Sequence, residues 1–155
     1  MRPRASRAAP GKSAQPLWGK LASGATVLVD TAPFIYVLEE HPRFADQFAG
    51  LFALADAGAL QIALSTVTLA EVLTGPFKAG NNALGRRYEK ALSQYTLVPV
   101  SAPIAVLAAR LRADYRLKLP DAIQLASALD IGAAALVTHD RDFSRVSGMD
   151  VLTGD

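Results

Sequence analysis

Residues 26–30, Thr-Val-Leu-Val-Asp, decide the fold class, because they form a short apolar run that ends on an acid. The run is partly β-branched and predicts a buried strand. Pro33 suits the first turn of a helix, and apolar residues recur at helical spacing from Phe34 up to Glu40. A strand followed directly by a helix is the first half of a βαβ unit, which favours a parallel sheet.

The same alternation of short strands and longer helices continues along the chain. Further strands are predicted at residues 61–65, 95–100, 134–138 and 150–153. The helix after the second strand is predicted to break at Gly75-Pro76. We therefore expect an α/β fold, a single domain with a central, mostly parallel sheet flanked by helices.

The composition is typical of one folded domain, with 155 residues of which 51% are hydrophobic and 19% are charged. The absence of cysteine excludes disulfides, thiolate metal sites and cysteine nucleophiles, and is compatible with a reducing cytoplasm. No apolar run reaches the ~18 residues that a membrane-spanning helix needs. We expect a cytoplasmic protein without a membrane partner.

The positive charge is concentrated at the N-terminus. Residues 1–29 hold five basic residues and no acid, whereas residues 30–155 hold 11 basic and 14 acidic residues. Proline, glycine and serine are frequent before the first strand, and apolar residues are too few there to build a core. We predict a flexible basic tail over residues 1–24 and a folded domain over residues 25–155. The tail either attracts phosphates or is only solvated.

Four acids are predicted to meet at one edge of the sheet. Asp30 and Asp140 follow strands, Asp121 lies in the first turn of a helix, and Glu71 lies early in another. The carboxyl ends of parallel strands and the amino ends of the following helices share one edge, where such folds bind ligands. Carboxylates crowded together repel one another unless a cation lies among them, and oxygen ligands select Mg²⁺ or Mn²⁺.

A cation held in this way can polarise a phosphodiester, lower the pKa of a bound water and stabilise the departing oxygen. The chemistry needs no nucleophilic side chain. It therefore suits a chain that has no cysteine, two histidines and no serine elbow motif. We interpret His139 as a loop residue and the Phe44, Phe48 and Phe52 stripe as core or partner-facing surface.

Four segments together resemble the acidic motifs of the PIN domain family, in order and spacing. They are Val27-Leu28-Val29-Asp30-Thr31, Thr68-Leu69-Ala70-Glu71-Val72, Leu119-Pro120-Asp121-Ala122-Ile123 and Val137-Thr138-His139-Asp140-Arg141-Asp142-Phe143. The resemblance covers about residues 25–155. It implies metal-dependent cleavage of single-stranded RNA by a PIN-like nuclease domain, and for small bacterial members the role of a VapC-type toxin.

The resemblance also implies residue roles and partners. The metal-binding and catalytic acids would be Asp30, Glu71, Asp121 and Asp140, with Asp142 as an auxiliary ligand of Mg²⁺ or Mn²⁺. Hydroxyl groups of Thr31 and Thr138 would orient carboxylates or substrate. The expected partners are the RNA substrate, a cognate VapB-type antitoxin and a second copy of the chain in a homodimer.

Basic residues near these motifs are candidates for contact with the RNA backbone. They are Arg86, Arg87 and Lys90 in one helix, and Arg110, Arg112, Arg116 and Lys118 ahead of Asp121. Each group is equally consistent with a solvated helix face.

Three other functions share the same fold class. A phospho-accepting receiver domain lacks support, because no second acid stands two residues after Asp30 and no lysine follows a late strand in the expected context. A catalytically silent binding module is disfavoured by the intact acids. A PIN-fold nuclease acting in RNA processing or on DNA stays open.

Overall fold

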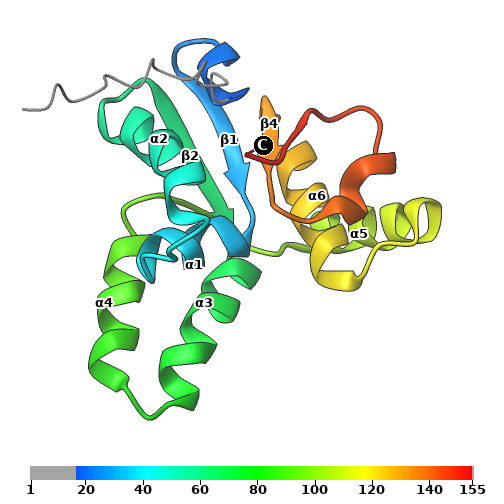
Figure 1. Cartoon of the computed structure of the whole chain (residues 1–155). Coiled ribbons are helices and arrows are strands. Elements are labelled where there is room, and N and C mark those ends of the chain that lie inside the picture. Colours follow the sequence, from blue (N-terminus) through cyan, green and yellow to red (C-terminus); the bar gives the residue numbers. More distant parts are fainter. Residues whose placement is uncertain (1–16, 155) are drawn as a thin grey trace, which may run out of the picture.

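The computed structural model describes residues 17–154, and within this range five strands form one sheet (Figure 1). The strand order is β3-β2-β1-β4-β5. The strands are β1 (Ala25–Val29), β2 (Leu60–Ser65), β3 (Thr96–Val98), β4 (Ala135–Val137) and β5 (Val151–Leu152). Every pairing among them is parallel. The predicted α/β fold with a central parallel sheet is therefore confirmed.

The opening strand β1 is the middle of this sheet. It pairs with β2 from Ala25 opposite Leu60, and with β4 from Val27 opposite Ala135. Its last three residues are fully buried because helices cover both faces of the sheet. Strands buried on both faces read as continuous apolar runs, which is why residues 27–29 lack alternation.

Six α-helices and two 3₁₀ helices surround the sheet within the described residues. The α-helices are α1 (Thr31–Leu38), α2 (Ala45–Asp56), α3 (Thr66–Lys78), α4 (Asn82–Leu92), α5 (Ala102–Tyr115) and α6 (Leu119–Asp130), and the 3₁₀ helices are η1 (Leu17–Lys20) and η2 (Arg141–Arg145). None of these helices is long and apolar enough to cross a membrane.

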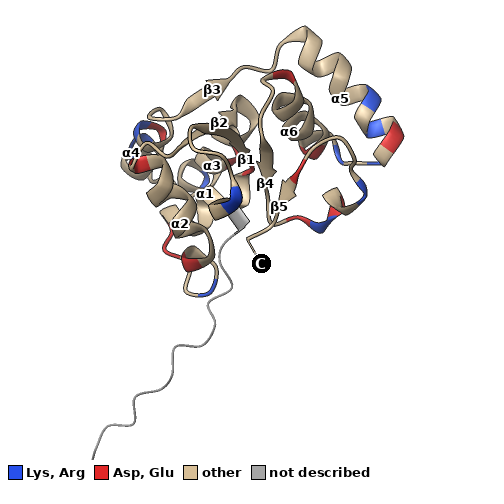
Figure 2. Ribbon diagram, turned by 90° about the horizontal axis from the view of Figure 1, so that it is seen from above, with Lys and Arg blue, Asp and Glu red and all other residues tan. Residues whose placement is uncertain are grey.

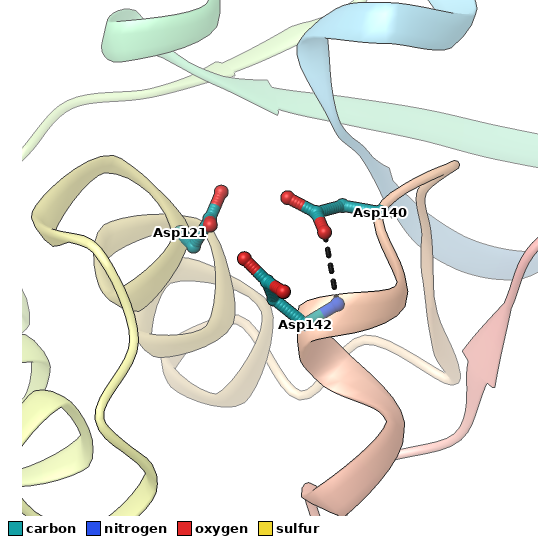
Figure 3. A group of neighbouring side chains, drawn as sticks. All are labelled: Asp121, Asp140 and Asp142. Atoms are coloured by element: carbon teal, nitrogen blue, oxygen red, sulfur yellow. Dashed lines mark hydrogen bonds between the residues drawn. The ribbon is translucent and has the colours of Figure 1, made fainter.

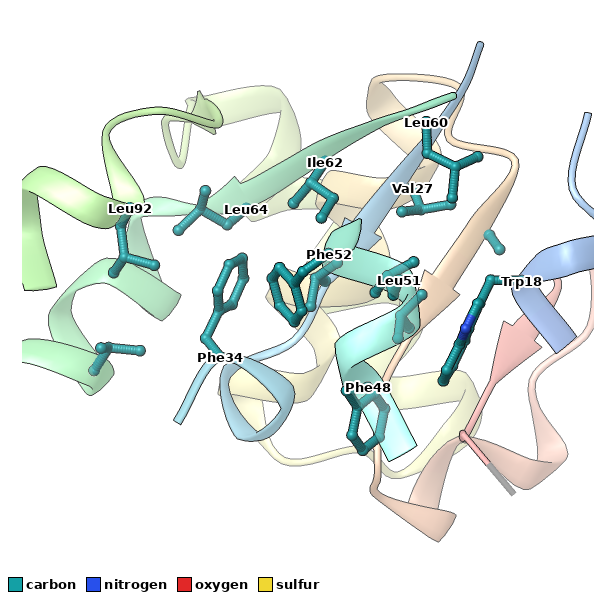
Figure 4. Close-up of a cluster of buried hydrophobic side chains, with 14 residues drawn as sticks. Trp18, Val27, Phe34, Phe48, Leu51, Phe52, Leu60, Ile62, Leu64 and Leu92 are labelled. Atoms are coloured by element: carbon teal, nitrogen blue, oxygen red, sulfur yellow. The ribbon is translucent and has the colours of Figure 1, made fainter. Parts of the chain in front are cut away.

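Two apolar clusters lie on opposite faces of the sheet. One packs α1 and α2 against the sheet and includes Phe34, Phe48 and Phe52 (Figure 4). The other packs α5 and α6 and includes Ile104 and Leu125. The phenylalanine stripe of α2 is therefore core at Phe48 and Phe52, as one of its two interpretations predicted.

The segment just before β1 packs on the domain. Trp18 in η1 is only 2% exposed, and its ring centroid lies 5.7 Å from that of Phe48 (Figure 4). Of the tail predicted over residues 1–24, residues 1–16 lie outside the described part of the chain. Residues 17–24 lead into β1, and the buried indole ties this stretch to the core.

Helix α3 corrects one prediction, because it continues through Gly75-Pro76 and ends at Lys78. Proline lacks the N–H that would bond one turn back, so a break was expected there. The last turn is instead held by packing, since the Phe77 ring lies over Gly85 of α4, at a point where any side chain would collide with it. Gly80, with φ of +70°, then ends the turn. Helices α3 and α4 extend side by side beyond the sheet (Figure 1).

Candidate functional site

Asp30 lies at the point where the chain leaves the sheet and enters α1. Its side chain caps the helix, with Oδ1 accepting a hydrogen bond of 2.7 Å from the Thr31 backbone N–H. Its Oδ2 accepts one of 2.8 Å from the Thr138 hydroxyl. The residue is 8% exposed, so these bonds hold the carboxylate in one orientation.

Thr138 joins Asp30 to the second acidic strand end. The hydroxyl that donates to Asp30 also accepts a bond of 3.0 Å from the Asp140 backbone N–H. Asp140 in turn caps η2, with Oδ1 accepting from the Asp142 N–H at 2.8 Å. The loop after β4 is therefore shaped by short side-chain caps that place two carboxylates beside the sheet edge.

Asp121, Asp140 and Asp142 form the open part of the site (Figure 3). Asp121 projects from the first turn of α6 toward the two acids of the loop. One carboxylate oxygen from each residue lies within 4.8 Å of the others. An oxygen-only set of this spacing fits a small divalent cation and offers no soft ligand.

Glu71 reaches the same region from α3. Its Oε1 accepts a bond of 3.4 Å from the Thr31 hydroxyl. The neighbouring Val72 is buried in the core, whereas Glu71 is exposed. Val72 thus faces the core, whereas Glu71 is among the residues that line the acidic pocket.

One pocket of about 410 Å³ collects these acids. The residues that line it are Asp30, Thr31, Ala32, Ile35, Tyr36, Glu71, Asp121, His139, Asp140 and Arg141. The structure therefore brings together the four acids singled out from the sequence. Asp142 stands beside Asp121 and Asp140 at the edge of the pocket.

The pKa values reflect this crowding. Burial raises the pKa of Asp30, against the hydrogen bonds from Thr31 and Thr138 that lower it. Burial and the neighbouring acids Asp140, Asp30 and Asp142 raise the pKa of Asp121 to about 7, although Lys118 lowers it. The pKa of Glu71 is raised by burial and then by Asp30. A cation among these carboxylates would offset the part of the shifts that comes from repulsion between the acids.

The predicted RNA-contact residues do not gather in the pocket. Arg86 and Arg87 of α4 are exposed, and so are Arg112 and Arg116 at the end of α5. Figure 2 shows basic residues in blue on both helices. Lys118 is close enough to influence Asp121. Among the described residues that line the pocket, the only cation is Arg141. Arg141 was quoted within a motif but was not singled out as a substrate contact.

Two polar pairings around the site were not predicted from the sequence. His139, interpreted as a loop residue, lines the pocket, and its Nδ1 lies 2.9 Å from the Tyr36 hydroxyl oxygen. Gln124 is fully buried in α6 and hydrogen-bonds to Ser65 and Thr68. The one available signal was a lone glutamine within the otherwise apolar and small residues 122–129.

Known proteins resemble this chain in sequence and in fold. A family model of the PIN domain matches residues 27–149. A toxin–antitoxin complex from Klebsiella pneumoniae contains a chain 35% identical to this one, with a TM-score of 0.65, and the match covers 83% of this chain and 98% of that chain. No match was found among curated proteins.

Two further structures are similar at lower identity. VapBC2 from Rickettsia felis, bound to a DNA fragment from its promoter, matches with 22% identity and a TM-score of 0.66 over 81% of this chain and 96% of that chain. VapC20 from Mycobacterium tuberculosis, described as a sarcin-ricin loop cleaving toxin, matches with 18% identity and a TM-score of 0.60 over 76% of this chain and 92% of that chain. These two likenesses support the fold.

Proposed function

The chain belongs to the PIN domain family, and from that premise we propose that it is a metal-dependent endoribonuclease and the toxin of a VapBC-type pair. The observation that carries the proposal is the convergence of Asp30, Glu71, Asp121 and Asp140 on one pocket at the carboxyl edge of the sheet. The substrate we propose is single-stranded RNA in the cytoplasm. The metal is Mg²⁺ or Mn²⁺.

The residues that would hold the ion are Asp121, Asp140 and Asp142, whose carboxylate oxygens lie within 4.8 Å of one another, together with Asp30 and Glu71, which line the same pocket. The fit is supported by the oxygen-only donor set and by the pKa of Asp121, which burial and then its acidic neighbours raise. When bound, a divalent ion polarises a phosphodiester and makes a water molecule more acidic.

The protein's own side chains supply orientation and charge. Thr138 holds the Asp30 carboxylate and the Asp140 backbone through one hydroxyl, and Thr31 donates to Glu71. Arg141 lies on the pocket wall, where a guanidinium group can bind a phosphate oxygen without reading the base. The carboxylates are therefore placed before substrate arrives, which favours an in-line displacement.

The proposed protein partner is a VapB-type antitoxin. Support comes from the 35%-identical chain, which belongs to a toxin–antitoxin complex, and from the other VapBC structures that share the fold. An antitoxin segment that inserts a basic or apolar group beside the acids would block the pocket. We also propose a homodimer as the free form of the toxin.

Cleavage assays test the enzymatic proposal. The purified chain should cut single-stranded RNA with Mg²⁺ or Mn²⁺, and EDTA should abolish the reaction. Asp121→Asn should remove activity while leaving the circular dichroism spectrum unchanged. Asp114→Asn, which neutralises an exposed acid on α5, is the matched control and should keep full activity.

Each alternative has its own outcome. Activity that survives both EDTA and Asp121→Asn would refute the proposed site. Cleavage of single-stranded DNA in preference to RNA would replace the substrate by DNA. An intact fold without cleavage of any tested nucleic acid would favour a silent binding module. Co-expression with the product of the adjacent gene should yield a stable complex, and two separate proteins would contradict the antitoxin proposal.

A further inference from the structure

A network of side-chain hydrogen bonds runs behind the acidic pocket, and three of its residues, Ser65, Thr68 and Gln124, have no role in the proposed function. Ser65 Oγ donates to Gln124 Oε1 at 3.0 Å, and Gln124 Nε2 donates to Thr68 Oγ1 at 2.6 Å. Thr68 Oγ1 lies 3.1 Å from Thr31 Oγ1, and Thr31 Oγ1 donates to Glu71 Oε1 at 3.4 Å. The network starts at Ser65, the last residue of β2, and ends on the carboxylate of Glu71.

Each residue of this hydrogen-bond network donates to the next one, in the order from Ser65 to Glu71. An ionised Glu71 only accepts, so the single proton of the Thr31 hydroxyl is directed to it. Thr31 must then accept from Thr68, whose own proton is free because Gln124 Nε2 donates to the Thr68 oxygen. An acceptor at the Gln124 Nε2 position would draw the Thr68 proton to itself. Thr31 would then be free to turn its own proton toward Thr68 and away from Glu71.

The side chains of this network are buried to a degree that is unusual for polar groups. Ser65, Thr68 and Gln124 are fully buried, and Thr31 is 9% exposed. Buried polar groups give little net stability compared with apolar residues of the same shape, and each costs free energy if its partner is lost. Hydrogen bonds aligned in a low-dielectric interior also polarise one another. A network in which every buried side-chain oxygen and nitrogen has at least one partner gives defined orientation rather than stability.

The hydrogen-bond network links three elements that carry acids of the site. Gln124 lies one turn after Asp121 on α6, Thr68 lies one turn before Glu71 on α3, and Thr31 follows Asp30 at the start of α1. Ser65, which caps α3 through its Oγ and the Thr68 N–H at 3.2 Å, ends β2. Gln124 therefore couples the position of α6 to that of α3.

The geometry points to Gln124 and Thr68 as positioning residues that direct the Thr31 proton to Glu71 and hold α6 and α3 at the spacing that a divalent cation requires. The inference rests on the proposed metal site, since the cation is what the spacing would serve. Neither residue touches the ion or the RNA. Both act through Thr31 and through the backbone of the helices.

Calorimetric titration of the full chain with Mn²⁺ alone tests this inference. Thr68→Val keeps the shape of the side chain but removes its hydroxyl, and Gln124→Met removes the amide. Both should weaken Mn²⁺ binding about tenfold, since outer partners of metal ligands typically contribute about 10–100-fold. Thr68→Ser restores the hydroxyl and should recover most of the affinity.

Ser127→Ala is the matched control for lost buried hydroxyls. Ser127 is fully buried on the same helix, but its Oγ donates only to the Ile123 carbonyl oxygen at 2.7 Å. Its removal should leave the Mn²⁺ affinity within twofold of wild type, whatever it does to melting temperature. If the network had only a structural role, the Mn²⁺ affinity would follow the melting temperature across all four variants.

The outcomes separate the inference from the proposed function. Wild-type affinity in both Thr68→Val and Gln124→Met, with Mn²⁺ bound normally, overturns the inference and leaves the nuclease proposal standing. An equal loss in Ser127→Ala, or no recovery in Thr68→Ser, also overturns it. A wild-type chain that binds no Mn²⁺ overturns the metal site itself, and the positioning role falls with it.

Discussion

The inner and outer halves of the acidic pocket are built in different ways. The inner half is Asp30, Thr31 and Thr138, buried and hydrogen-bonded by the end of the sheet. The outer half is Asp121, Asp140 and Asp142, three acids that crowd one another at the open side. Folding alone orients the inner carboxylate, whereas the outer carboxylates repel one another until a cation joins them. Substitutions in the two halves should therefore have different effects on cleavage and on stability.

The largest difference is expected in the rate of cleavage. Asp30→Asn keeps the shape and one of the two acceptor oxygens of the buried side chain but removes its charge, so we expect a loss of about 10³-fold in kcat/KM with the fold intact. Asp142→Asn at the exposed edge should lose about tenfold. Single-turnover RNA cleavage measures both. Equal losses would erase the distinction between the two halves.

Stability should change in opposite directions. Thr138→Val removes a buried donor to a carboxylate and should lower the free energy of unfolding by about 1.5–3 kcal/mol. Asp121→Asn relieves repulsion from the nearby acids and should raise the melting temperature of the metal-free protein. Thermal denaturation in EDTA compares them, with Asp114→Asn as a charge-matched control. A lower melting temperature for Asp121→Asn would show that the outer acids do not repel.

The affinity for metal should rise with pH because of the outer half. The pKa of Asp121 is raised to about 7, so its carboxyl is protonated below that pH and a cation must displace the proton. Competition by one proton predicts roughly a fivefold gain in Mn²⁺ affinity from pH 6 to pH 7 and about twofold more by pH 8. The free energy of unfolding of the metal-free protein should instead fall as pH rises. The stabilisation that comes from the raised pKa of Asp121 is present at low pH and is lost as pH rises through about 7.

Calorimetry at three pH values measures the affinity. The Asp121→Asn variant removes the group to which this dependence is assigned, so its profile should be flatter. An affinity that is independent of pH in the wild type, or a profile that stays steep in the variant, would contradict the assignment.

The smallest effect concerns the substrate. Arg141 lies on the pocket wall, so Arg141→Ala should raise KM about threefold with little change in kcat. Arg86→Ala, on α4 and away from the pocket lining, should change KM by less than twofold. Initial rates over a range of RNA concentrations decide the matter. Equal increases in KM for the two variants would indicate that the RNA also contacts α4.

The outline of the fold and the convergence of the acids were predictable from the sequence for a physical reason. A buried parallel strand requires an apolar run, and its end must lie at the edge where Asp30 and Asp140 emerge. The break predicted at Gly75-Pro76 was wrong because packing of Phe77 over Gly85 is a contact between helices that no local pattern encodes.

The remaining features depend on tertiary contacts in the same way. The positions of Gln124 in the buried network and of Arg141 on the pocket wall were not predicted, because the type of a single residue does not show which distant elements surround it. Burial of Trp18 depends on α2, which begins 27 residues later in the chain, at Ala45. The sheet edge could be located from periodicity, but the hydrogen bonds that prepare it could not.

Anomalous scattering from a crystal soaked in Mn²⁺ tests the central claim most directly, because it locates the ion without assuming activity. We predict a peak between the carboxylates of Asp121, Asp140 and Asp142, on the side that faces Asp30, and its loss in Asp121→Asn. A peak elsewhere on the chain, or none at Mn²⁺ concentrations that support cleavage, would contradict a metal-dependent site built from these acids.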